Sequence, residues 1–151
     1  MLRDRLKDAL REAMKEQDKR AVSTVRLVLA ALKDRDIAAR GRGQSDGLED
    51  DDILALLQKM VKQRRESIEL YEKAGRDDLV LQEREEIAVI SRFLPQLMDE
   101  QATAAAVDAA MSELKADSIK DMGRVMAALK ERFPGKMDFA KASGMVKERL
   151  A

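Results

Sequence analysis

The stretch Lys62–Leu79, KQRRESIELYEKAGRDDL, predicts a helix that ends in a tight turn. Ile68 and Tyr71 stand at helical spacing and line one face of this helix. Gly75 stands where the helix should end, because glycine readily adopts the left-handed conformation that follows a helix. A second helix is predicted from about Asp77 to Leu94. The stretch therefore predicts an antiparallel helical hairpin.

Arg64 is the residue of this stretch that needs a partner. It falls three residues after Val61 and four before Ile68, so its guanidinium shares the apolar face of the helix. A cation in that position requires an opposite charge. Glu83 and Glu86, three residues apart on the next helix, can supply that charge across the hairpin. We therefore predict a structural ion-pair cluster of Arg64, Glu83 and Glu86.

Two other interpretations of the hairpin remain open. Lys62, Arg65 and Arg76 can form a basic groove for a phosphate group. Glu83 and Glu86 can act as a catalytic carboxylate pair, although paired carboxylates are common on solvated helices. The structural ion pair is the interpretation that the spacing favours.

The composition of the chain is typical of a helical protein. Its 151 residues include only two prolines, and 3% are aromatic. Alanine, leucine, glutamate, lysine and arginine dominate, and no segment alternates as a strand would. The sequence therefore predicts an all-α fold.

The helical pattern divides the chain into two parts. The segment LPQLMDEQ, residues 94–101, marks a boundary between a helical N-terminal domain, residues 1–95, and a small three-helix tail domain, residues 96–151. The four N-terminal helices are predicted at about residues 2–16, 19–39, 50–74 and 77–94. The three helices of the tail are predicted at about residues 99–114, 118–132 and 138–150.

Charge alone does not indicate a nucleic-acid-binding protein, because 29 basic residues balance 29 acidic ones. The first 43 residues carry 12 basic and 7 acidic residues, a net charge of +5. The segment RGRGQSDG, residues 40–47, is predicted to be a flexible, solvated loop, with contact to a nucleic-acid backbone as the alternative. The tail, residues 96–151, carries nine residues of each sign. Binding to a polyanion therefore requires a local basic surface.

The segment Lys120–Lys136, KDMGRVMAALKERFPGK, holds the candidate binding residues of the tail. Lys120 and Arg124 lie four residues apart, and Lys136 follows in the next loop. Gly123 lies between the first two, where a helical glycine costs about 0.5–1 kcal/mol relative to alanine. Its missing side chain allows close approach of a neighbouring helix or of a nucleic-acid backbone, and the flanking methionines favour the helix. If the tail binds a nucleic acid, we expect Lys120, Gly123, Arg124 and Lys136 to form the RNA-binding site.

Residue types that are missing exclude several kinds of chemistry. The chain has no histidine and no cysteine. It therefore has no imidazole-activated nucleophile and no thiolate or imidazole metal site. We predict no catalytic residues, no metal and no cofactor. The charged N-terminus and the lack of an apolar run of about 20 residues lead us to expect a cytoplasmic protein without membrane contact.

Several motifs in order resemble the YqeY-like family over nearly the whole chain. The matching motifs are KQRRESIELYEKAGRDDL, the glutamates of LQEREEI, FLPQLM, MGRVMAALKERFPGK and SGMVKERL. The C-terminal part of that family is similar to the tail domain of GatB, a subunit of the glutamine-dependent aspartyl/glutamyl-tRNA amidotransferase. The resemblance implies an all-helical fold with a helical N-terminal domain and a three-helix tail. In GatB the tail contacts tRNA, whereas nucleotide binding and amide transfer lie in other parts of the enzyme.

Three functions are compatible with this resemblance. The first is an accessory protein related to the amidotransferase, which binds tRNA or an aminoacyl-tRNA synthetase without catalysis of its own. The second is a helical protein–protein adaptor with no role in RNA binding. The third is a component of a carbon–nitrogen ligase that uses glutamine as the amide donor, acting with separate subunits.

Overall fold

The computed structural model describes residues 1–44 and 46–151, and Ser45 of the predicted 40–47 loop lies outside the described residues. The described residues form seven α-helices and one 3₁₀ helix, without a strand among them, which confirms the predicted all-α fold. The chain divides into two compact units, Met1–Leu94 and Pro95–Ala151. This division is adjacent to the boundary expected after residue 95.

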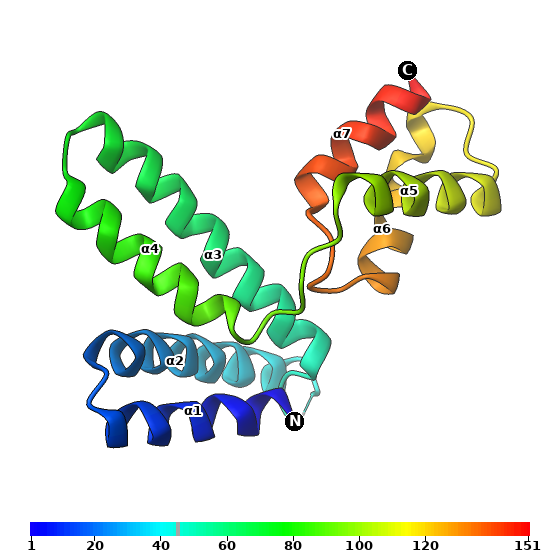
Figure 1. Ribbon diagram of the computed structural model, residues 1–151. Helices are drawn as coiled ribbons and strands as arrows, with labels where there is room; N and C mark the ends of the chain where they lie inside the picture. The colour runs from blue at the N-terminus through cyan, green and yellow to red at the C-terminus, as the bar shows by residue number, and fades with distance from the viewer. Residues whose placement is uncertain (45) are drawn as a thin grey trace. The chain divides into compact units, whose positions relative to one another are not determined.

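The first unit contains two helical hairpins. Its helices are α1 (Leu2–Glu16), α2 (Lys19–Gly41), α3 (Asp50–Lys73) and α4 (Asp77–Ser91). Figure 1 shows α1 beside α2 and α3 beside α4, each pair running in opposite directions. The two hairpins pack on each other because α2 contacts both α3 and α4, and α1 contacts α3.

Short-range signals in the sequence explain where the helices of the first unit begin and end. The carboxylate of Asp18 accepts a hydrogen bond from the Ala21 amide at 3.1 Å and caps the start of α2. Gly75 follows α3 with a φ of +68°. The Arg76 amide then donates to the Tyr71 carbonyl at 2.9 Å, which closes the turn of the α3–α4 hairpin.

The apolar faces of the four helices meet in one core. Burial of these side chains is the main favourable contribution to the stability of the unit. The residues with the largest fully buried side chains in this core are Leu6, Val25, Val28, Leu32, Ile53, Leu57 and Ile90.

A buried carboxylate near the end of α2 joins three segments of the first unit, and we call its contacts the Asp36 network. Arg3 of α1 donates two hydrogen bonds to Asp36, at 2.5 and 3.0 Å. The same guanidinium donates to the Leu48 carbonyl at 3.0 Å, and the Leu48 amide donates to Asp36 at 2.9 Å. Asp36 is only 8% exposed. The network therefore ties α1, α2 and the segment that precedes α3.

The network also contributes to the pH dependence of the stability of the unit. The hydrogen bond from Arg3 lowers the pKa of Asp36 most strongly, and the Leu48 amide adds to this effect. A carboxyl group whose pKa is lower in the folded state stabilises the fold above its unfolded pKa of about 3.9. This contribution is lost as the pH falls through the lowered pKa of the folded state.

The second unit is a three-helix arrangement. It contains α5 (Glu100–Leu114), the 3₁₀ helix η1 (Ile119–Asp121), α6 (Met122–Arg132) and α7 (Phe139–Leu150), and each α-helix contacts the other two (Figure 1). The side chains of Asp99 and Asp138 cap α5 and α7.

The core of the second unit is separate from that of the first. Val107 of α5, Val125 and Leu129 of α6, and Val146 of α7 are fully buried in it. Met122 and Met126 are partly buried and pack against these residues. The apolar stripes of α5, α6 and α7 thus face one another.

Three helices differ clearly from the sequence prediction. The helix α2 continues to Gly41 instead of ending at residue 39, so it includes the first two residues of the predicted loop 40–47. The helix α4 ends at Ser91, three residues before the expected end at Leu94, because the amides of Arg92, Phe93 and Leu94 each donate to the carbonyl three residues earlier. The predicted helix 118–132 is divided into η1 and α6. Here the Asp121 carboxylate accepts hydrogen bonds from the amides of Asp117 and Ser118 and fixes a tighter first turn.

The Asp36 network predicts that Gly47→Ala destabilises the protein more than Gly43→Ala. Both glycines have a positive φ, +84° at Gly47 and +94° at Gly43, which costs a residue with a side chain roughly 1–2 kcal/mol. A Cβ at residue 47 would also lie 2.6 Å from Oδ1 of Asp36, whereas a Cβ at residue 43 meets no atom of the described residues within 4 Å. Thermal unfolding should therefore show the larger fall in Tm for Gly47→Ala, and equal falls would contradict this role of Gly47.

Candidate nucleic-acid interface

Three of the four predicted RNA-binding residues lie together at the start of α6. Lys120 belongs to η1, and Gly123 and Arg124 belong to the first turn of α6. All three are exposed. Gly123, which has no side chain, thus has one cation before it in the chain and one after it.

The close approach of a neighbouring helix to Gly123, which we favoured from the sequence, is wrong. A Cβ built at Gly123 meets no atom of the described residues within 4 Å. The adjacent Met122 packs against the core, but the glycine itself faces open space. The neighbouring methionines therefore lie on the buried side of α6, whereas Gly123 lies on a different side.

Arg124 is partly neutralised by an acidic neighbour. Its Nη2 donates to Oδ1 of Asp121 at 2.8 Å and to the Leu114 carbonyl at 3.3 Å. The hydrogen bond from Arg124 lowers the pKa of Asp121 most strongly. The amides of Asp117 and Ser118 add smaller effects, and the pKa falls to about 2. Asp121 is therefore ionised at neutral pH, while the Arg124 side chain stays 56% exposed. Arg124 can still contact an anion, although part of its charge is already balanced.

Lys136 does not join this group. It is exposed and follows the end of α6, whereas Lys120 precedes its start. The 11 residues of α6 extend about 16 Å along the helix axis, which separates the two lysines. The Lys136 carbonyl accepts a hydrogen bond from the Met98 amide at 2.7 Å, so the backbone at residue 136 has a structural role within the second unit. Of the four predicted residues, only Lys120, Gly123 and Arg124 therefore lie together.

The structure brings Arg64 and Glu86 together across the α3–α4 hairpin. Nε of Arg64 donates to Oε2 of Glu86 at 3.0 Å, and the two side chains are 13% and 8% exposed. Nη1 of Arg64 also donates to the Met60 carbonyl at 3.1 Å. Glu83 interacts with Arg64 only at longer range, and burial, together with the charge of Glu86, raises the pKa of Glu83.

The described residues of the hairpin form neither the basic phosphate groove nor the catalytic carboxylate pair that the sequence left open. Arg76 is held by Asp78 through two hydrogen bonds, at 3.2 and 3.1 Å. Lys62 and Arg65 are exposed on α3, three and more helical turns before Arg76, so these three residues do not converge on one phosphate. Glu86 is buried against Arg64 and is not available as half of a catalytic pair.

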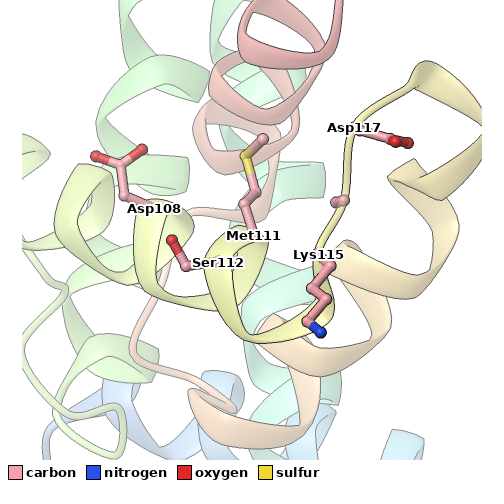
Figure 2. A pocket seen from close by; sticks show the side chains of 6 residues that line it. Asp108, Met111, Ser112, Lys115 and Asp117 are labelled. Atoms are coloured by element: carbon pink, nitrogen blue, oxygen red, sulfur yellow. The ribbon is translucent and has the colours of Figure 1, made fainter.

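A shallow depression of about 580 Å³ lies at the C-terminal end of α5, and no sequence motif indicated it. It is lined by Asp108, Met111, Ser112, Lys115, Ala116 and Asp117. Figure 2 shows that the Lys115 side chain points away from Asp108 and from Asp117. Asp108 is already paired with Nε of Arg149 at 2.5 Å. The polar groups of this depression therefore do not converge on a ligand.

Residues 1–44 and 46–151 contain no group of three or more acidic side chains placed to hold a metal ion. Over the same residues, no helix is both long enough and apolar enough to cross a bilayer.

These features define an all-helical chain of two compact units. The profile of the YqeY-like protein family matches residues 3–150, nearly the whole chain. The chain belongs to the YqeY-like family.

Relatives of the chain are named "Altered inheritance of mitochondria protein 41, mitochondrial". The chain is 36% identical to the protein of Eremothecium gossypii over 112 residues, which cover 73% of this chain and 59% of the relative. It is 36% identical to the protein of Lachancea thermotolerans over 109 residues, 72% of this chain and 55% of the relative. Identity to the protein of Saccharomyces cerevisiae strain YJM789 is 30% over 92 residues, 61% of this chain and 48% of the relative. The chain spans about half the length of these relatives.

The names of these relatives correct the expectation of a cytoplasmic location. All three are named as mitochondrial proteins, which conflicts with a purely cytoplasmic assignment. The expectation rested on the charged N-terminus and on the lack of an apolar run, and neither feature identifies a compartment.

The burial of the Arg64–Glu86 pair predicts that Arg64→Ala destabilises the protein more than Arg76→Ala. Removing one partner of a buried pair leaves an unpaired charge and costs about 3–5 kcal/mol, whereas an exposed pair contributes under about 1 kcal/mol. The Arg76 and Asp78 side chains are 57% and 66% exposed. Urea unfolding should show the larger fall in unfolding free energy for Arg64→Ala, and equal falls would rule out a structural role for the buried pair.

The raised pKa of Glu83 predicts that Glu83→Gln stabilises the protein at neutral pH and not in acid. Ionisation of Glu83 costs more in the folded state than in the unfolded state, so the wild type loses stability as the pH rises from about 4.3 through the raised pKa. Glutamine does not ionise and avoids this loss. The unfolding free energy of the wild type and of Glu83→Gln is measured at about pH 3 and about pH 7, and the two proteins should differ only at pH 7. A variant less stable than the wild type at pH 7 would contradict the raised pKa of Glu83.

Proposed function

We propose that this chain is an accessory protein without catalysis of its own, which binds tRNA through its second unit. The observation that carries the proposal is the arrangement around Gly123. Lys120 and Arg124 are exposed on either side of a residue above which there is open space. The resemblance of the family's C-terminal part to the GatB tail gives the class of ligand.

The missing side chain at Gly123 is suited to contact with a sugar–phosphate backbone. A phosphate can approach the start of α6 without meeting a Cβ, and the two cations can contact the same phosphate or its neighbour. Two contacts give weak binding that recognises the shape of the RNA. The logarithm of the binding constant should then fall with the logarithm of salt concentration with a slope of about −1.4 to −1.8.

A protein–protein adaptor is the second candidate function, and one observation favours it. Leu70 of α3 and Leu81 of α4 are 66% and 58% exposed on either side of the Gly75 turn. Exposed leucines can contribute to a protein contact, although single exposed apolar residues are normal on a soluble surface. An aminoacyl-tRNA synthetase would be such a partner. These residues lie in the first unit, so variants of the second unit separate the two functions.

The proposal predicts that Lys120→Glu with Arg124→Glu abolishes tRNA binding by the full-length protein. Reversal of both charges replaces attraction to phosphate by repulsion. Filter binding or fluorescence anisotropy with a tRNA transcript measures the affinity. Lys130→Glu with Lys141→Glu is the matched control, because it changes the charge of the same unit equally at two exposed positions of α6 and α7.

Gly123→Leu supplies a second test that does not change charge. The open space at Gly123 predicts that the variant folds with an unchanged or higher Tm, because a glycine within a helix is itself unfavourable. Its tRNA affinity should fall because the leucine side chain occupies the surface of approach. Full affinity in both Gly123→Leu and the double charge reversal would exclude this part of the second unit as the RNA-binding surface, whereas no tRNA binding by the wild type would favour the adaptor.

A further inference from the structure

A regular row of cations follows one side of α2, and we call it the α2 row. Its members are Lys19, Arg26, Lys33 and Arg40, each seven residues after the last. Seven residues are nearly two turns of an α-helix, so successive members are rotated by only about 20° and lie on one face. The row extends for about 32 Å along the helix.

The cations of the α2 row are exposed and without a close acidic partner. All four are exposed, and none forms a salt bridge among the residues that the structure describes. Arg40 interacts with the buried Asp36 only through a longer-range charge effect. In contrast, Arg20 on a different side of α2 is bonded to Glu85 at 3.0 Å. The row therefore keeps its charge available to a ligand.

The acidic residues of α2 do not neutralise the row. The helix contains six basic residues and two acidic ones, Asp34 and Asp36. Asp36 is buried and bonded to Arg3, which leaves Asp34 as the acidic residue on the exposed side of α2. Lys7 follows Arg3 by four residues, so it lies on the side of α1 from which Arg3 reaches α2. This lysine is also exposed.

The opposite face of α2 fixes the row in place. Val25, Val28 and Leu32 are buried in the core of the first unit, and the Asp36 network holds the far end of the helix. The backbone that carries the four cations is thus already ordered, and only their side chains lose freedom when a ligand binds.

We infer that the α2 row is a second RNA-binding surface, which contacts the phosphate backbone. The inference rests on the proposed function for the identity of the polyanion. A straight row of separated cations suits a chain of phosphates, because each contact releases counterions without requiring a particular base.

An anionic membrane surface suits the α2 row less well. A helix that lies on a membrane inserts its apolar face between the lipids. The apolar face of α2 is occupied by the core of the first unit. Two exposed apolar residues of α2, Leu27 and Ile37, are 49% and 56% exposed, and they do not replace such a face.

The test compares two neutralised pairs in the full-length protein. Arg26→Gln with Lys33→Gln removes two charges from the row and keeps good helix-forming residues. Lys59→Gln with Lys73→Gln is the matched control, because it removes two exposed lysines of α3 that form no salt bridge among the described residues. The probe is a tRNA transcript, and the binding constant is measured from about 50 to 200 mM NaCl. Circular dichroism checks that both variants remain helical.

The row variant should bind tRNA at least about tenfold more weakly at the lowest salt concentration, and its salt slope should be smaller by about 1.4–1.8. The α3 control should match the wild type. An unchanged slope and affinity in the row variant, or an equal loss in the α3 control, would overturn the inference.

Two further comparisons separate this inference from the proposed function. Loss of binding in the Lys120→Glu, Arg124→Glu variant with an unaffected row variant refutes the row alone. Loss in the row variant with an unaffected tail variant supports the row and refutes the tail as the binding surface. Vesicles rich in phosphatidylserine form the last arm. If the protein binds these vesicles through the α2 row and does not bind tRNA, RNA is refuted as the partner of the row and of the surface around Gly123.

Discussion

The arrangement of the first unit depends on the hydrogen bonds that the buried carboxylate of Asp36 accepts. One side chain accepts hydrogen bonds from the Arg3 guanidinium of α1 and from the Leu48 amide that precedes α3. A buried carboxylate without such partners would be strongly unfavourable, so the rotation of α2 that aims Asp36 at them is strongly favoured. The same rotation directs the apolar stripe of α2 into the core and its row of lysines and arginines toward solvent. Burial of Asp36 and exposure of the α2 row are thus compatible with the same rotation of the helix.

Much of the fold could be predicted from the sequence because local signals determine it. Asp18, Asp99 and Asp138 act within three residues of their own position, and each caps a helix. Arg64 could be assigned a partner because its place in an apolar stripe made an isolated charge implausible. Asp36 gave no such signal, since its partners lie 33 residues earlier and 12 residues later in the chain. On the sequence alone it was an ordinary aspartate in a helix rich in charged residues.

The candidate site was predicted less well than the fold, and the errors have geometric causes. Gly123 was expected to face a helix because its neighbour Met122 does, but adjacent residues of a helix differ by 100° in direction. Lys136 was grouped with Lys120 by their closeness in the sequence, although an intervening helix places them at opposite ends. Sequence spacing shows that two residues within one helical turn lie close together. For two residues at opposite ends of a helix, the length of that helix must also be considered.

The even balance of charge in this chain conceals an uneven distribution. Arg64 and Arg3 are used inside the first unit, and Arg124 is shared with Asp121. A cation that already has a carboxylate partner must exchange it for a phosphate, which reduces the net gain on binding. The cations of the α2 row have no such partner to give up among the described residues, so each contact that they form with a polyanion releases bound counterions and adds in full to the affinity. If both surfaces contact one RNA, the α2 row should therefore supply most of the salt-dependent affinity, and the smaller surface around Gly123 should supply the constraint of shape.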